Sequence, residues 1–128
     1  MKSLLVKLGV ILIGLAIFGN AEVWGANWKF YGGNDDYWGY YDTQNMTRPS
    51  KNIIRVWEKW VYKVERKQGV CQSVVLTEID CVNKKNRDLS STDYSIEDKV
   101  LGGFSTPTEW VFIFPDSSGE VLYKEVCK

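Results

Sequence analysis

The stretch VCQSVVLTEIDC, residues 70–81, places alternating side chains between two cysteines. In a β-strand successive side chains point to opposite faces, so every second residue of this stretch shares one face. That face carries Ser73, Val75, Thr77, Ile79 and Cys81. The sequence therefore predicts one continuous strand over residues 71–81.

This strand restricts how the three cysteines, Cys71, Cys81 and Cys127, can pair. Ten extended residues separate Cys71 from Cys81 by about 33 Å, whereas a disulfide requires a Cα–Cα distance of about 4.4–6.8 Å. Cys127 is therefore left to pair with either one, and one thiol remains over. A Cys81–Cys127 bond would close a loop of about 46 residues and contribute about 4 kcal/mol. A leftover Cys71 would be a buried thiol in a monomer or a bridge between two copies.

Residues 1–21 have the layout of a secretory signal peptide. Lys2 and Lys7 form a positive start, an apolar run follows over residues 8–18, and small residues follow that run. We expect cleavage after Ala21 or Gly25 and one mature domain over residues 22–128; the alternative is an uncleaved membrane anchor. With no cysteine near the cleavage region, we expect export to the periplasm, cell surface or medium without a lipid anchor.

Charge and residue types exclude several functions. Removing residues 1–21 takes away two lysines and no acid, so the formal net charge falls from 0 to −2, which argues against nucleic-acid binding. The chain has no histidine, so Ser-His-Asp and Cys-His catalysis are excluded. A glycosidase pair drawn from Asp35, Asp36 and Asp42 is disfavoured in so small a domain. Without histidine or C-x-x-C spacing we expect no metal site and no cofactor.

The first half of the chain has the pattern of strands. Residues 28–31 and 37–42 are aromatic runs around GGNDD, which predicts a hairpin. Residues 47–52 (TRPSKN) are expected to form a loop. Residues 53–64 fit both a helical stripe and a strand face, but β-branched and aromatic residues favour the strand. A turn at residues 65–69 then leads into strand 71–81.

The second half ends in a helix. Residues 83–88 are expected to be a charged turn or strand start, 89–94 and 98–104 further strands, and 109–114 (EWVFIF) a short buried strand. Ser117 and Glu120 form a capping box, which predicts a helix start. Val121, Leu122 and Val126 would share one flank of that helix.

Aromatic residues are the candidate binding groups. The stretch YGGNDDYWGYYDTQ, residues 31–44, is rich in rings, and strand alternation should divide them between a buried and an exposed face. Rings exposed on an open sheet face would form a contact surface for a protein or a sugar. The candidate binding residues are Tyr31, Tyr37, Trp38, Tyr40 and Tyr41.

Several short motifs together resemble one family. YYDTQNM (40–46), RVW (55–57), EIDC (78–81), NRDL (86–89), the pattern W-x-x-x-x-P-D-S-S-G-E (110–120) and VC (126–127) follow one another. In this order they resemble the surface-adhesin protein E family of bacterial envelope proteins over about residues 28–127.

The resemblance implies an α+β, mainly β fold: a curved antiparallel sheet of about six strands. A C-terminal helix is held on its concave side by a disulfide whose partners fall on Cys81 and Cys127. It implies that RVW lies in a strand. It also implies binding to host extracellular-matrix proteins, and no binding residue is carried over.

Two functional hypotheses follow. The first is an exported, non-enzymatic bacterial domain that contacts protein partners through its sheet surface. The second is a periplasmic domain that binds a small ligand or glycan in the trough between sheet and helix. A small exported enzyme is a third, disfavoured reading.

The disulfide is the first testable prediction. Peptide mapping of the native protein without reductant should recover a Cys81–Cys127 link, and a Cys71–Cys127 or Cys71–Cys81 link would show the pairing to be wrong. If Cys71 bridges two copies, a band at twice the mass should disappear with reductant.

Overall fold

The computed structural model describes residues 25–128. The predicted signal peptide, residues 1–21, lies outside the described residues. The strands are β1 (Trp28–Gly33), β2 (Tyr37–Asp42), β3 (Thr47–Ser50), β4 (Ile53–Tyr62), β5 (Gln72–Asp80), β6 (Lys85–Tyr94), β7 (Val100–Phe104) and β8 (Val111–Phe112). A short 3₁₀ helix, η2 (Lys67–Gly69), joins β4 to β5, and the helix α1 (Ser118–Val126) ends the chain.

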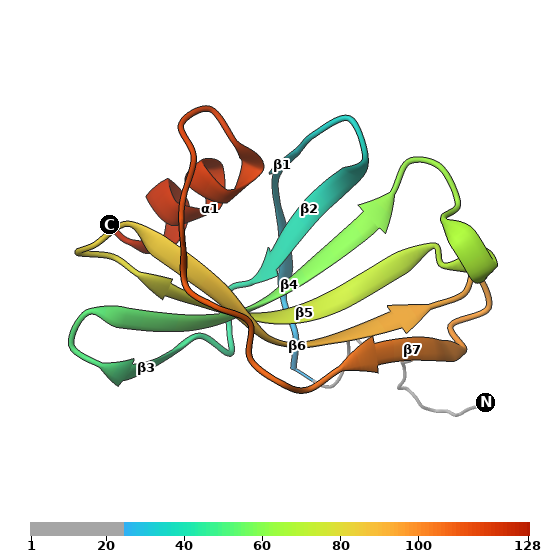
Figure 1. Cartoon of the computed structure of the whole chain (residues 1–128), viewed down its shortest axis with the longest axis horizontal. Helices are drawn as coiled ribbons and strands as arrows, with labels where there is room; N and C mark the ends of the chain where they lie inside the picture. The colour runs from blue at the N-terminus through green and yellow to red at the C-terminus, as the bar shows by residue number, and fades with distance from the viewer. Residues whose placement is uncertain (1–24) are drawn as a thin grey trace, which may run out of the picture.

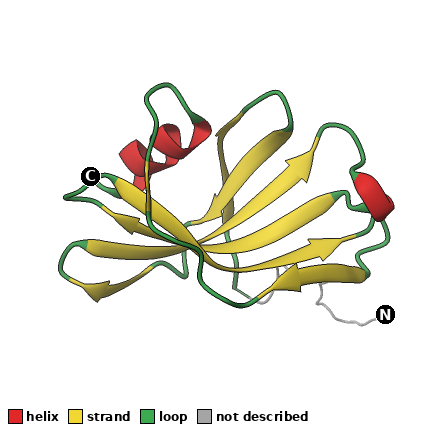
Figure 2. Ribbon diagram, viewed as in Figure 1, coloured by secondary structure: helices red, strands yellow, loops and turns green. Residues whose placement is uncertain are grey.

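The strands form one antiparallel sheet in the order β1-β2-β4-β5-β6-β7, while β3 pairs with β4 and β8 with β6 (Figure 1). Helix α1 lies over one side of this sheet and leaves the other side without a helix among residues 25–128 (Figure 2). The α+β, mainly β fold with about six main strands is confirmed.

Strand β5 lies at the centre of the sheet. It pairs with β4 from Ile53↔Asp80 to Val61↔Gln72, and with β6 along its whole length apart from a bulge after Leu76. Its alternate residues Ser73, Val75, Thr77 and Ile79 are at most 1% exposed. The predicted strand over residues 71–81 is thus confirmed, with a side-chain period of two.

The hairpin and the ambiguous segment were both predicted correctly. In the β1–β2 turn the side chain of Asn34 accepts hydrogen bonds from the backbone N–H groups of Asp36 and Tyr37, at 2.8 and 3.0 Å. Residues 53–62 form β4, where Ile54 and Val56 are buried on one face. A helix is excluded there because every residue of β4 from Ile53 to Val61 has a partner in β5.

Helix α1 packs on the sheet through one flank. Leu122 and Val126, one helical turn apart, enter the core. Their buried neighbours in this core are Tyr31, Tyr41, Ile54, Val56, Ile79 and Ile113. We call the sheet face that α1 packs on the covered face and the opposite one the open face.

A disulfide joins Cys81 to Cys127 with a Cα–Cα distance of 5.6 Å, as the family resemblance implied. It connects the residue after β5 to the residue after α1 and so ties the helix to the centre of the sheet. Cys71 is a free, half-buried thiol.

The helix start differs in detail from the predicted capping box. The Ser117 Oγ accepts from the Glu120 N–H at 3.2 Å, but the Glu120 carboxylate accepts from the Asp116 N–H rather than from Ser117. Its other oxygen binds Lys84 at 2.6 Å. The bond from Lys84, followed by the one from Asp116, lowers the pKa of Glu120 to about 2.

Three sequence predictions were wrong. Residues 47–50 form strand β3 and not a loop. This short strand tolerates Pro49 because the proline falls between the paired positions Thr47 and Ser50, where no N–H is needed. Residues 109–114 are not a buried strand: only β8 (Val111–Phe112) is extended in the sheet, and its two residues are 53% and 66% exposed. Val121 does not share the buried flank of Leu122 and is 43% exposed.

Neighbouring helix residues provide a matched test of this packing. Leu122→Ala should lower the free energy of unfolding by about 2–5 kcal/mol because it leaves a cavity under α1. Val121→Ala should change it by less than about 1 kcal/mol, because Val121 faces solvent. Urea denaturation of both variants, with the disulfide intact, measures the difference. Equal effects would contradict the assignment of Leu122 to the core.

Candidate functional site

The hairpin β1–β2 distributes its five candidate rings over both faces of the sheet. Tyr31 and Tyr41 are buried on the covered face, at 9% and 5% exposure, and the half-buried Tyr37 lies on the same side. Trp38 and Tyr40 point to the open face, where Trp38 is 46% exposed. The expected division into buried and exposed rings is confirmed, and the five residues do not form one surface.

The open face brings rings and cations together from across the sheet. Lys59 lies 4.8 Å from the ring centre of Trp28, and Lys63 lies 3.9 Å from that of Trp38. On the same face, at strand β6, Arg87 lies 4.7 Å from the ring centre of Trp110. Such pairs hold the cation by its attraction to the ring face. We call this surface the aromatic–cationic face; its residues are Trp28, Phe30, Trp38, Tyr40, Trp57, Lys59, Lys63, Lys85, Arg87, Trp110 and Phe112.

A charge triad links the strands beneath this face. The buried Glu78 of β5 accepts from Arg55 of β4 at 2.7 and 3.0 Å and from Arg87 of β6 at 2.9 Å. Burial alone would raise the pKa of Glu78, but the bonds from the two guanidinium groups outweigh it and lower the pKa. Both oxygens of this acid are thereby occupied, and the two cations keep their outer edges toward solvent, with side chains 39% and 30% exposed.

Sequence reasoning missed most of this face. Phe30 is 52% exposed and was not among the candidate rings. The cations Lys59 and Lys63 were read only as part of a strand. The sequence did contain a signal for these cations, because alternation in residues 53–63 puts Arg55, Lys59 and Lys63 on the face opposite the buried Val56.

The covered face contains a buried polar cluster around Glu58. Its carboxylate accepts from the Tyr31 hydroxyl at 2.6 Å, from the Trp60 indole N–H at 2.9 Å and from the Thr77 hydroxyl at 2.5 Å. These three donors compensate for the loss of water around a buried charge. Asp88 lies nearby, and burial followed by repulsion from Glu58 raises the pKa of Asp88 to about 6.

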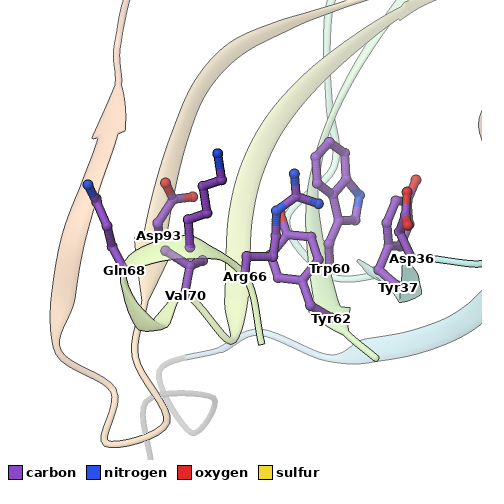
Figure 3. Close-up of a pocket in the computed structure, with 9 residues that line it drawn as sticks. Asp36, Tyr37, Trp60, Tyr62, Arg66, Gln68, Val70 and Asp93 are labelled. Atoms are coloured by element: carbon purple, nitrogen blue, oxygen red, sulfur yellow. The ribbon is translucent and has the colours of Figure 1, made fainter. Parts of the chain in front are cut away.

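A cavity of about 640 Å³ opens on the covered face, beside the β4–β5 connection. Figure 3 shows Tyr37, Trp60 and Tyr62 together along one side of it, with Arg66 and Gln68 from the connection and Asp93 from β6 beside them. Asp36, Lys67 and Val70 complete the lining. We call this the ring cavity.

The ring cavity does not lie in the expected trough between the sheet and the helix. The space under α1 is filled by core side chains, among them Leu122 and Val126. The ring cavity lies near the N-terminal end of α1, where the Tyr37 hydroxyl is 2.8 Å from Ser118 Oγ. Packing of the helix therefore moves the available space to one end of the covered face.

The three carboxylates considered for glycoside cleavage do not converge. Asp42 is 2% exposed and accepts from the backbone N–H groups of Asn27 and Gln44 at 2.9 and 3.0 Å, which is a structural role in the turn after β2. Asp36 lines the ring cavity, whereas Asp35 is not part of its lining. Among residues 25–128, no group of three or more Cys, Asp or Glu side chains is placed to hold a metal ion.

The fold and surface define the class of protein: a disulfide-closed antiparallel sheet with a helix on one face and an open face of rings and cations. The chain belongs to the surface-adhesin protein E family, whose model matches residues 28–128. No match to a curated protein or to a solved structure was found. Family membership points to an exported or surface-located, non-enzymatic protein with an adhesive binding role. In the part of the chain that the structure describes, no helix is long and apolar enough to cross a membrane.

Asp88 provides a pH-dependent prediction. Its pKa is raised from 3.8 to about 6, so between about pH 4 and 6 the folded protein binds this proton more tightly than the unfolded chain does. The contribution of Asp88 to the free energy of unfolding therefore falls as the pH rises through that range. Asp88→Asn should raise the free energy of unfolding at pH 7 by on the order of 1–3 kcal/mol, with the gain disappearing below about pH 4.

Urea denaturation of Asp88→Asn at pH 7 and pH 3.5 checks this. The control is Asp35→Asn, which removes an exposed carboxylate from the β1–β2 turn. A variant less stable than the wild type at pH 7 would show that Asp88 is needed as an anion in the fold.

Proposed function

We propose that this protein is an exported bacterial binding domain that contacts protein partners through its aromatic–cationic face. The observation that supports this is the joint exposure of rings and cations on one side of the sheet, with Lys63 held over Trp38 at 3.9 Å. Exposed aromatic residues and arginine are the side chains enriched where proteins meet.

Charge defines the kind of partner. The open face presents Arg55, Lys63, Lys85 and Arg87, whereas its central acid, Glu78, is buried and bound on both oxygens. A partner that places carboxylates between apolar or aromatic side chains would match this pattern. We therefore propose that the face binds an acidic segment of a host extracellular-matrix protein, in keeping with the adhesive role of the family.

The proposed location follows from the N-terminal sequence. Residues 1–21 would direct export and be removed, so that residues 22–128 act in the periplasm, at the cell surface or outside the cell. The open face would then be available to partners beyond the inner membrane. Cell fractionation, combined with pull-down of partners by the mature domain, tests the location and the class of partner together.

A second candidate function is the binding of a small ligand or glycan. The ring cavity favours it, because its volume of about 640 Å³ is in the range of small-molecule sites. This function would use the end of the covered face rather than the space under α1.

Charge reversal on the open face tests the first proposal. The probe is a synthetic peptide in which glutamates flank one tyrosine, with a glutamine counterpart as the uncharged control. Lys63→Glu and Trp38→Ala should each weaken binding of the acidic peptide and of the captured matrix protein about tenfold, which corresponds to about 1.4 kcal/mol. Added salt should weaken it further.

The matched control is Lys124→Glu, which makes the same charge change on the exposed side of α1. It should leave binding unchanged, as measured by surface plasmon resonance. If Lys124→Glu and Lys63→Glu weaken binding equally, only net charge matters and the proposed face is wrong.

A further inference from the structure

One wall of the ring cavity consists of three aromatic rings. Tyr37 and Trp60 are stacked, with ring centres 5.0 Å apart and planes 18° apart, and Tyr62 meets Tyr37 edge-on at 6.4 Å. These three rings come from two neighbouring strands, and Tyr37 pairs directly with Tyr62 across β2 and β4.

The polar end of each ring is held by a side chain behind the wall. The Tyr37 hydroxyl bonds to Ser118 at 2.8 Å, the Trp60 indole N–H donates to Glu58 at 2.9 Å, and the Tyr62 hydroxyl bonds to Ser73 at 2.9 Å. The wall is therefore formed before any ligand arrives, which lowers the entropy cost of binding.

The rim carries both signs of charge. Arg66 and Lys67 are exposed residues of the β4–β5 connection, and neither forms an ion pair within residues 25–128. The Arg66 guanidinium lies 4.8 Å from the ring centre of Tyr62, so it is held beside the wall. Asp36 and Asp93 bring carboxylates to the same opening, and Asp93 is held by the Ser73 hydroxyl at 2.6 Å.

The β4–β5 connection contains two consecutive residues with positive φ. Gln68, a non-glycine residue, has a left-handed φ of 63°, a conformation that is uncommon for such side chains. It is followed by Gly69 with φ of 81°, a residue that adopts this region freely. This turn places three consecutive polar side chains, Arg66, Lys67 and Gln68, on the rim of the cavity.

From these features we propose that the ring cavity is a binding site for a saccharide unit that carries one carboxylate or sulfate group. The apolar C–H face of a sugar ring packs on one outer face of the stacked Tyr37–Trp60 pair. The anionic group is bound by Arg66 and Lys67 through charge-assisted hydrogen bonds. The hydroxyl groups of the sugar donate to Asp36 and Asp93, whose carboxylates accept hydrogen bonds.

This inference specifies the ligand of the second candidate function and does not depend on the aromatic–cationic face. The two sites lie on opposite faces of the sheet and share no residue. Failure of one therefore leaves the other intact, and the variants below separate them.

The experiment uses two disaccharides of the same linkage, one containing glucuronate and one containing glucose in its place. Each is titrated into the isotopically labelled mature protein, and binding is followed by two-dimensional NMR. The glucuronate disaccharide should bind about tenfold more tightly than the neutral one. Both should shift the indole N–H of Trp60 and the backbone amides of residues 66–70.

Variants on the rim test the role of each charge. Arg66→Gln combined with Lys67→Gln should reduce the preference for glucuronate to less than about twofold while leaving the affinity for the neutral sugar unchanged. Asp36→Asn should weaken both sugars. These residues are exposed, so folding is preserved. Arg48→Gln, the same change on the exposed strand β3, and Lys63→Glu on the open face are the controls and should bind as the wild type does.

Several outcomes would overturn the proposal. These are no shifts from either disaccharide at tens of millimolar, shifts confined to the open face, or an unchanged preference in the double variant. Tighter binding of ATP than of the glucuronate disaccharide would instead assign the cavity to phosphorylated ligands. Comparison of the disaccharide with longer acidic oligosaccharides distinguishes the source: affinity that rises with chain length indicates a polymer, and constant affinity indicates a chain end.

Discussion

The disulfide between Cys81 and Cys127 is the constraint on which the rest of the structure depends. It joins the end of the central strand β5 to the end of α1, with 5.6 Å between the two Cα atoms. In a domain of this size such a bond supplies a large share of the stability. Because α1 is held there, Leu122 and Val126 cover Ile54, Val56 and Ile79, and the opposite side of the sheet is left to solvent.

This one-sided cover explains how one short hairpin serves two purposes. Neighbouring residues of a strand point to opposite faces, so Tyr37 and Trp38 contribute to different surfaces. Tyr37 belongs to the preformed wall of the ring cavity, whereas Trp38 lies on the open face under Lys63. The aromatic content of the hairpin is therefore not one site but a part of two.

Two buried acids of the sheet, Glu58 and Glu78, are bound by different kinds of donor. Glu58 faces the core and is bound by neutral donors, Tyr31, Trp60 and Thr77. Glu78 faces the other way and is bound by the guanidinium groups of Arg55 and Arg87. The first arrangement fixes Trp60 in the cavity wall, and the second fixes two cations on the open face. Both acids thereby position groups that we assign to binding.

The sequence by itself determined the local structure: the strand over residues 71–81, the β1–β2 hairpin and the start of α1 follow from alternation, turn residues and capping. Family motifs added the sheet-plus-helix fold and the Cys81–Cys127 pairing. Alternation also shows which residues share a face, but not which face is covered. That was decided by tertiary packing of α1, which buried Tyr31 and Tyr41, left Val121 and β8 exposed, and moved the cavity to one end of the sheet. The open face and the ring cavity join residues from strands far apart in the chain, and no local pattern contains that distance information.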